Sequence, residues 1–357
     1  MKKKGLCVLI LSAVAIISIL LLLPFAQAPA AEVVRWIGQE DFARAEAPFG
    51  PFKQGYCGVA GPNRVFYDWL TKATKGRLVI DWADVGAICP PSETIDLVSR
   101  GAIQIAHTTG PFHSGKVPEA DIACGLVLAH TNAWSHWDCL YHYGLNEELK
   151  KVYAKRNINY FPIFMDSIVN IGATFPLDKP EAVKGKKIRA VGQYGDFIAA
   201  LGGIPVAIPL AEVYMGLKLG TINGWVSGLA MLGSAKWQEV TKYAISSPTL
   251  SPWTDMIIIN MDAFKALPQD IQELLERDMP YVGFTSAWVF HQQCEWVIAN
   301  AAKQFGVKFY TWSPEDMKRV TEPVVEKVWP KMAAKTPECA KMVEIVKKQL
   351  RDYGRIP

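Results

Sequence analysis

The sequence predicts an α/β protein made of two lobes, with a ligand cleft between them. Strand-like and helix-like segments alternate along the chain, and the same alternation begins again after residue 180. This pattern is typical of largely parallel sheets covered by helices. The length agrees, because about 325 residues follow a predicted leader, and a chain of that size usually divides into more than one core.

The leader has the pattern of a signal peptide. Three lysines at positions 2–4 precede an apolar run from Leu6 to Leu23, and small residues crowd positions 26–31. We therefore expect a cleaved signal peptide of residues 1–30 and a protein exported to the periplasm. The alternative is an uncleaved membrane anchor, since an apolar run of 18 residues could just span a bilayer.

The first α/β unit follows the leader. Apolar residues at positions 65, 66, 69, 70 and 73 share one face of a helix, and Gly76 ends it. The expected elements, in order, are strand Val33–Gly38, helix Pro62–Lys75, strand Arg77–Ala83, helix Glu93–Arg100 capped by Ser92, and strand Ala102–His107. This order resembles half of a doubly wound sheet, whose ligands lie beyond the carboxyl ends of the strands.

A similar unit recurs in the second half of the chain, with glycines at the predicted helix ends. The expected elements are strand Lys186–Val191, helix Tyr194–Leu201, strand Val206–Ile208, helix Leu210–Leu219 and strand Thr221–Val226. Two α/β lobes in one chain place a ligand cleft between them, and closure of the lobes is the natural motion.

A long helix is expected beyond Pro268, ending at Phe305 because Gly306 follows. Pro280 lies inside it and should kink or split it. A helix of this length can brace both lobes. We expect the first lobe to hold residues 31–165 and about 255–290, and the second lobe residues 166–254 and about 291–357, including C-terminal helices.

The charge balance excludes one class of partner. The chain has 38 basic and 34 acidic residues, and three of the lysines lie in the leader, so the mature part carries 35 against 34. A near-neutral protein lacks the excess of positive charge with which proteins bind the phosphates of nucleic acid. Since no second long apolar segment follows, we expect the mature protein to be soluble.

Six cysteines remain after the leader, and export to an oxidising compartment permits disulfides. The favoured pair is Cys57 with Cys89, because both lie in loops near the carboxyl ends of neighbouring first-lobe strands. Buried free thiols are the alternative. None of the cysteines is spaced as C-x-x-C, which argues against a redox motif or a zinc ribbon.

Three motifs in the second unit carry a family resemblance. They read G-K-K-I-R at 185–189, L-G-G-I-P at 201–205, and E-V-Y-M-G-L-K-L-G-T-I-N-G at 212–224. In this order they resemble the solute-binding proteins of tripartite ATP-independent periplasmic (TRAP) transporters, the DctP-like family. The segments 91–106 and 266–268 also fit it.

The resemblance implies a function and a fold. The implied fold is the two-lobed periplasmic binding protein fold. The implied function is the capture of a small organic acid by cleft closure and its delivery to the TRAP membrane subunits, with no cofactor and no enzymatic activity. A secreted hydrolase with an unrecognised site, or a sensor subunit that presents the ligand to a receptor, is the alternative.

Arg189 is the main site residue that the resemblance implies. In the family, the arginine of the "K-I-R" strand pairs with the carboxylate of the substrate. A guanidinium suits this task, because its two parallel donors match the two oxygens of a carboxylate and it stays charged at any relevant pH.

Further substrate-binding candidates follow from the same resemblance. In the second lobe, Asn223 stands where the family has an aspartate, Ser227 stands about where it has a ligand asparagine, and Trp225 could form a pocket wall. Asn170 lies where some relatives place another polar contact. In the first lobe, Gln39 in the loop 39–42 and Thr108 at a strand end should face the cleft, although each could be an ordinary structural residue.

Enzymatic and metal sites find little support. Five of the six histidines lie between His107 and His142, but His136 and His142 are six residues apart, which suits neither one helix face nor a zinc-finger pair. Neither a G-x-S-x-G elbow nor a phosphate-binding P-loop occurs. A family branch that binds 2-oxo acids with a metal ion carries a glutamate before its tryptophan, where this chain has Gly224, so we expect no bound metal.

Overall fold

The computed structural model describes residues 33–42, 61–164 and 168–356. The fold below is that of the unit Val34–Pro357. The predicted signal peptide and the predicted partner Cys57 lie outside the described residues. Among those residues, no helix has both the length and the apolar character that crossing a membrane requires.

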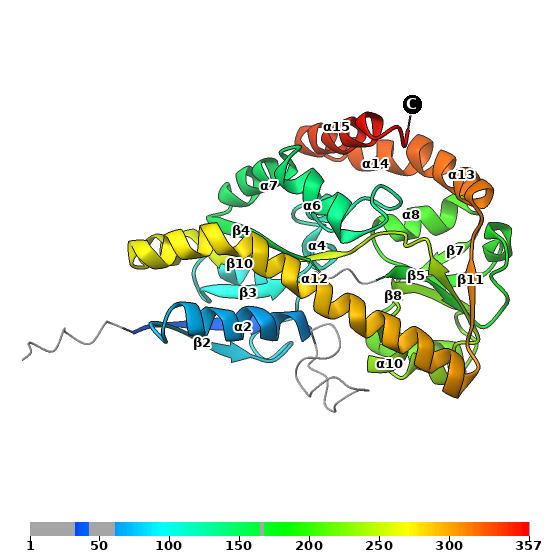
Figure 1. The fold of residues 1–357 in the computed structure, drawn as a ribbon, viewed down its shortest axis with the longest axis horizontal. Helices are drawn as coiled ribbons and strands as arrows, with labels where there is room; N and C mark the ends of the chain where they lie inside the picture. Colours follow the sequence, from blue (N-terminus) through cyan, green and yellow to red (C-terminus); the bar gives the residue numbers. More distant parts are fainter. Residues whose placement is uncertain (1–32, 43–60, 165–167, 357) are drawn as a thin grey trace, which may run out of the picture. The chain divides into compact units, whose positions relative to one another are not determined.

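Two mixed sheets form the framework (Figure 1). The first has the order β2-β1-β3-β10-β4 and consists of β1 (Val34–Glu40), β2 (Leu78–Ala83), β3 (Ile105–Thr108), β4 (Ile158–Phe164) and β10 (Thr254–Asn260). Strand β1 is parallel to β2 and β3, whereas β10 is antiparallel to both of its neighbours. The prediction of largely parallel sheets was therefore wrong for β10, which returns to the first sheet from the second.

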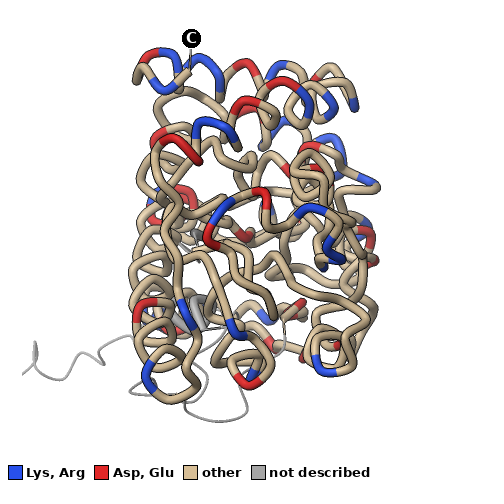
Figure 2. Tube along the Cα trace, turned by 90° about the vertical axis from the view of Figure 1, so that its right-hand side faces the viewer, with Lys and Arg blue, Asp and Glu red and all other residues tan. Residues whose placement is uncertain are grey.

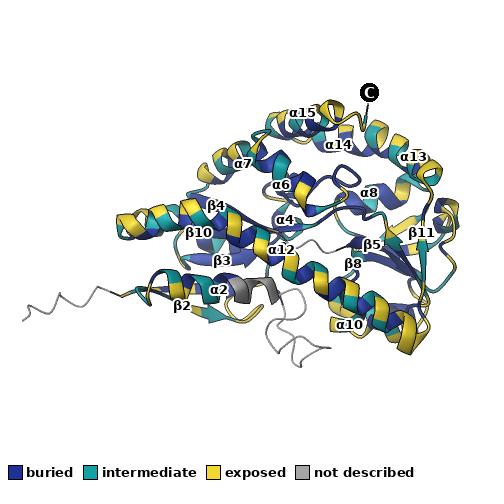
Figure 3. Ribbon diagram, viewed as in Figure 1, coloured by how far each residue is buried: buried dark blue, intermediate teal, exposed yellow. Residues whose placement is uncertain are grey.

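The second sheet has the order β11-β9-β5-β8-β6-β7. Its strands are β5 (Val169–Ala173), β6 (Lys187–Arg189), β7 (Ile204–Val206), β8 (Gly224–Gly228), β9 (Tyr243–Ser247) and β11 (Lys308–Thr311). Strands β7, β6 and β8 run parallel, and β5 is antiparallel to β8 and β9. Every residue of β5 and β10 is buried, because helices cover both faces of each sheet (Figure 3).

Helices surround both sheets. They are α2 (Gly61–Ala73), α3 (Thr94–Ser99), α4 (Gly110–His113), α5 (Ala120–Ala123), α6 (Ala133–Tyr141), α7 (Leu145–Ala154), α8 (Gln193–Ala200), α9 (Val213–Lys218), α10 (Met231–Ser234), α11 (Met261–Lys265), α12 (Gln269–Phe305), α13 (Pro314–Pro323), α14 (Trp329–Ala333) and α15 (Pro337–Asp352). Short 3₁₀ helices occur at η1 (Pro180–Val183), η2 (Leu210–Glu212) and η3 (Trp237–Glu239), and the π-helical segment η4 (Val324–Val328) joins α13 to α14.

Most predicted elements of the second half are confirmed, with shifted ends. Strand β7 begins two residues before the predicted strand at 206, and the predicted helix Leu210–Leu219 is the turn η2 followed by α9. Helix α13 begins with a cap, because the hydroxyl of Ser313 accepts a hydrogen bond from the amide of Asp316. In the first half, Ser92 does not cap α3, whose N-cap residue is Glu93.

Helix α12 links the two sheets. It runs without interruption from Gln269 to Phe305, and Gly306 ends it with a φ of 69°. Pro280 does not split it, contrary to one of the two expected effects. The helix packs against α2, α6 and β4 on the first sheet's side and against α10, η3 and β11 on the second (Figure 1). It therefore braces both lobes, as predicted.

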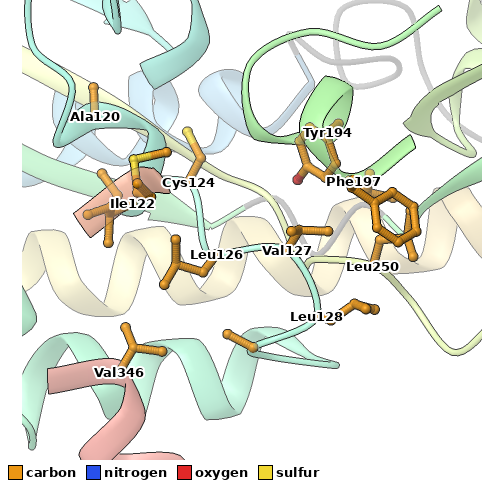
Figure 4. Packing of buried hydrophobic residues seen from close by; sticks show 14 of the residues in the cluster. Ala120, Ile122, Cys124, Leu126, Val127, Leu128, Tyr194, Phe197, Leu250 and Val346 are labelled. Atoms are coloured by element: carbon orange, nitrogen blue, oxygen red, sulfur yellow. The ribbon is translucent and has the colours of Figure 1, made fainter. Parts of the chain in front are cut away.

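One hydrophobic core extends through both lobes. It includes Ile158 and Met256 of the first sheet, Ile171 and Ile188 of the second, and Val346 of α15. Figure 4 shows the loop at residues 126–128 within this core, between α8 and α15. The lobes are thus joined by packed side chains as well as by chain crossings.

The C-terminal helices divide their contacts between the lobes. Helix α15 packs against α5, α6 and α7, which flank the first sheet, while η4 packs against α8 of the second. Acidic and basic residues alternate along these helices (Figure 2) and form pairs such as Lys347 with Glu344 and Lys348 with Asp352. The predicted domain boundaries, including the assignment of residues about 291–357 to the second lobe, stay a prediction.

The five described cysteines are Cys89, Cys124, Cys139, Cys294 and Cys339, all buried as free thiols. The favoured pair of Cys57 with Cys89 is not described, because Cys57 lies outside the described residues. The Sγ atom of Cys89 lies 3.6 Å from the amide nitrogen of Gln39 and 3.6 Å from the hydroxyl of Thr94.

Gly110 tolerates no side chain where α4 meets α5. An added Cβ would lie 1.9 Å from the carbonyl oxygen of Ala120. This oxygen belongs to the backbone, so it cannot move away by a change of side-chain rotamer. Gly110→Ala should therefore lower the free energy of unfolding by about 3 kcal/mol, as overpacking does, in urea titrations. Gly115→Ala is the matched control, since nothing lies within 4 Å of its added Cβ. Equal stability of the two variants would contradict the close approach.

Candidate functional site

A cavity of about 730 Å³ lies where strands of both sheets end. From the first lobe come residues that follow β1, β2 and β3, and from the second lobe residues at and after the ends of β6, β7 and β8. Its lining consists of Asp41, Phe42, Val85, Pro91, Thr109, Pro111, Phe112, Val169, Arg189, Val191, Tyr194, the segment 207–211, the segment 226–228, Ala230, Met231, Ser234, Ala235, Trp253 and Phe290. Ligands of open α/β sheets bind at such carboxyl ends.

Arg189 is the one cationic side chain among the described residues of this lining. It is the last residue of β6, and its guanidinium donates from Nε to the carbonyl of Ile208 at 3.1 Å and from Nη1 to that of Val226 at 3.2 Å. Burial lowers the pKa of Arg189 to about 10, so it stays charged at neutral pH. Because no described carboxylate pairs with it, the buried cation can accept an anion from the cavity.

Asp41 lies in the lining contributed by the first lobe, and Gln39 fixes its position. The side-chain amide of Gln39 donates to Oδ1 of Asp41 at 2.8 Å, and the hydroxyl of Thr94 donates to the same oxygen at 2.7 Å. The other end of Gln39 accepts hydrogen bonds from the amides of Ile88 and Cys89. Burial raises the pKa of Asp41 to about 6, so the carboxyl is mostly ionised at pH 7.

A buried ion cluster lies behind this wall. Nδ1 of His107 is 2.5 Å from Oε1 of Glu40, and Nε2 is 3.4 Å from Oδ2 of Asp255. Burial alone lowers the pKa of His107, but the two carboxylates outweigh it and raise the pKa to about 10. The cluster also supports the cavity, because Asp255 accepts a hydrogen bond from the indole of Trp253, and the ring of Phe42 lies 5.0 Å from that of His107.

Of the residues predicted for substrate binding, Arg189 and Ser227 line the cavity together. Trp225 does not, because its ring is fully buried against Trp237, at 4.9 Å between centroids, and its indole donates to the hydroxyl of Thr241. The pocket wall expected from Trp225 is therefore corrected to a core position. Its ring fills the space over Gly172, where an added Cβ would lie 2.2 Å from it.

Four other predicted residues also lie outside the lining. Asn170 is buried in β5 and donates to the carbonyl of Pro248, and Asn223 accepts from the amide of Lys187 at the start of β6. Thr108 is buried at the end of β3, one residue before Thr109, which does line the cavity. Gln39 does not line the cavity, but its side-chain amide donates a hydrogen bond to Asp41, which does. The expectation that the loop 39–42 faces the cleft is met by its last two residues.

Sequence reasoning missed most of the aromatic lining. Phe112 and Tyr194 follow strand ends, so the rule for carboxyl ends could have suggested them. The sequence around Trp253 gives no sign that it lines the cavity, because it precedes an antiparallel strand. Phe290 lines the cavity from helix α12. Among the described residues, no group of three or more His, Cys, Asp and Glu side chains is placed to hold a metal ion.

Comparison with known proteins gives a family match over most of the chain. The model of the family described as "Bacterial extracellular solute-binding protein, family 7" (DctP) matches residues 63–336. A monocarboxylate 2-oxoacid-binding periplasmic protein of Nostoc is 26% identical over 216 residues, which are 58% of this chain and 57% of that protein. The ectoine-binding periplasmic protein of Halomonas elongata is 24% identical over 203 residues, 54% of this chain and 57% of that protein. The chain thus spans less than two thirds of the length of these curated relatives.

Solved structures confirm the predicted two-lobed fold. A TRAP periplasmic solute-binding protein from Pseudoalteromonas atlantica, with bound sodium and pyruvate, superposes with a TM-score of 0.76 at 20% identity, covering 90% of this chain and 95% of that chain. One from Rhodoferax ferrireducens, with bound malonate, gives a TM-score of 0.74 at 19% identity, covering 90% and 100%. At these identities the likeness shows the fold alone.

Proposed function

Because this chain belongs to the bacterial extracellular solute-binding protein family 7, we propose that it captures a small organic carboxylate and delivers it to the membrane subunits of a TRAP transporter. The observation that carries the proposal is the charged Arg189, buried in a cavity wall with no described carboxylate beside it. An anion from solution would supply the missing charge, and its two oxygens would match the guanidinium.

Capture proceeds by closure of the cleft. Arg189 belongs to the second lobe, while Phe42 and Thr109 line the cavity from the first. A carboxylate bound at Arg189 gains contacts with the first lobe only when the lobes approach each other. Binding therefore favours the closed form by the difference in contact free energy between the two states.

We further propose that the chain binds its ligand without chemistry, after export to the periplasm and cleavage of residues 1–30. The hydroxyls of Ser227 and Ser234 are the serine nucleophiles in the described lining, and no histidine or cysteine lines the cavity with them. A serine with no adjacent base is a weak nucleophile. The relatives named above are described as binding proteins, which supports this reading.

Calorimetry against acids and their matching amides tests the proposal. Pyruvate, malonate and 3-phenylpropanoate are titrated into the mature protein beside the corresponding amides, and the small molecule that the protein retains on purification is identified by mass spectrometry. At least one acid should bind saturably and its amide should not. Equal binding of acid and amide would contradict a role for Arg189 in recognising charge.

The same acid, at saturation, should reduce the radius of gyration in small-angle X-ray scattering. It should also change the fluorescence of Trp253, which lines the cavity, more than that of the buried Trp225. Trp253→Phe provides the control for the fluorescence signal. Identical scattering with and without a bound acid would mean that capture does not involve closure.

A further inference from the structure

We propose that the ligand is a monocarboxylate with a bulky apolar body, an aromatic ring above all, held between two pairs of aromatic side chains. Phe42 and Phe112 form the first pair, and Tyr194 and Trp253 the second. The inference rests on the proposed function, since it takes a carboxylate at Arg189 as given. It concerns the remainder of the ligand, which the family leaves open.

The first aromatic pair belongs to the first lobe. Phe42 follows β1 and Phe112 lies on α4, and their ring centroids are 5.5 Å apart with a tilt of 41°. Phe42 is backed by His107, whose ring is 5.0 Å away. The pair is therefore fixed from behind by the buried ion cluster and presents apolar ring surface to the cavity.

The second aromatic pair joins the second lobe to the crossing between the sheets. Tyr194 of α8 and Trp253 are nearly parallel, with centroids 5.9 Å apart and 14° between the ring planes. The indole nitrogen of Trp253 donates to Oδ1 of Asp255 at 2.7 Å, so its one polar atom is satisfied inside the protein. Trp253 also has a φ of 49°, an uncommon backbone state for a residue other than glycine.

Among the described residues of the lining, few polar side chains remain to recognise further groups on the ligand. Apart from Tyr194 and Trp253, the described lining offers Arg189, Asp41, Thr109, Ser227 and Ser234, and the rest are aliphatic residues, proline, glycine, alanine, methionine and phenylalanine. Among the described lining residues, Arg189 is the only cation. A second carboxylate on the ligand would find no positive partner among these residues and would share the cavity with Asp41. A polar body would lose its hydration to apolar walls.

The cavity is also larger than a short acid needs. Its volume of about 730 Å³ falls in the range of pockets that enclose drug-sized ligands. A phenyl ring buried between the two pairs would raise the affinity over that of the ring-free acid by about 100-fold or more, from apolar area and ring contacts together.

Four probes separate the possibilities by calorimetry on the mature protein: 3-phenylpropanoate, propanoate, succinate and 3-phenylpropanamide. We expect 3-phenylpropanoate to bind about 100-fold tighter than propanoate, and succinate to bind more weakly than 3-phenylpropanoate. Succinate or propanoate binding as tightly as 3-phenylpropanoate would overturn the inference and leave the proposed function standing. If 3-phenylpropanamide binds as tightly as 3-phenylpropanoate, the proposed carboxylate capture fails instead. Absence of binding by all four would count against both.

Variants test the two aromatic pairs directly. Phe112→Ala and Trp253→Ala should each reduce the preference for 3-phenylpropanoate over propanoate by about tenfold, while the weak affinity for propanoate changes little. This ratio does not respond to a general loss of folded protein. Trp288→Ala is the control, because Trp288 is 61% exposed on α12 and does not line the cavity. An unchanged ratio in both cavity variants would overturn the inference.

Discussion

Replacing Arg189 by alanine is expected to weaken the binding of a carboxylate ligand by about 30-fold to several-thousand-fold. The range corresponds to the roughly 2–5 kcal/mol that truncating one member of a buried charge pair costs. Arg189→Lys should also lose much of the affinity, because an ammonium cannot reproduce the two parallel donors of a guanidinium. Calorimetry with the best-binding acid measures both variants.

The fold should survive the change at Arg189. In the absence of ligand its guanidinium is buried without a described counter-charge, a costly arrangement that alanine relieves. The free energy of unfolding of Arg189→Ala should therefore equal or exceed that of the parent protein. Arg35→Ala serves as control, since Arg35 is exposed on β1, outside the cavity lining. Unchanged affinity in both Arg189 variants would refute the assignment.

Replacing His107 by glutamine is expected to lower the free energy of unfolding at pH 7 by about 3–5 kcal/mol. The protonated ring lies between the carboxylates of Glu40 and Asp255, and removing one member of a buried ion cluster leaves the others uncompensated. Urea titrations of the parent protein and the variant measure the loss. His142→Gln is the control, because His142 pairs with Asp138 at the surface, where such pairs contribute little.

The loss of unfolding free energy caused by His107→Gln should become smaller as the pH rises. A folded-state pKa raised from 6.5 to about 10 means that the stabilisation is fully present below pH 6.5 and is lost as the pH rises toward 10. The difference between parent and His107→Gln should therefore shrink from pH 7 to pH 10. Among the described residues, the carboxyl groups of Glu40 and Asp255 and the ring of Phe42 face His107. A difference that stays constant over this range would mean that His107 is already neutral at pH 7.

Helices and parallel strands with clear end signals were predictable from the sequence. Gly101, Gly202, Gly220 and Gly306 all adopt a positive φ where helices end, because glycine has no Cβ to oppose that conformation. Strand β10 was not predictable in the same way. Its direction depends on pairing with β3 and β4, which are far away along the chain, and an apolar run carries no sign of direction.

The candidate site was predictable where chemistry dictates the residue type. Arg189 was predicted because its K-I-R strand resembles the family motif, and the structure places its side chain in the cavity lining. Trp225 and Asn170 share a sheet face with Ser227, because Trp225 lies two residues before it and Asn170 is its cross-strand partner. They lie outside the lining because Trp225 packs against Trp237 and Asn170 donates to the carbonyl of Pro248, contacts that the strand pattern does not show. Trp253 was missed because its place in the lining depends on Asp255, on Tyr194 and on the crossing between the sheets.

The core shared by both lobes limits how much disorder the open protein can have. Ile158 of the first sheet and Ile188 of the second belong to one packed cluster, and α12 spans both sheets. Two lobes that share a packed core can change their relative orientation only over a small range before a ligand binds. In the proposed closure, little conformational entropy would then be lost, so more of the contact free energy in the cavity would be retained as affinity.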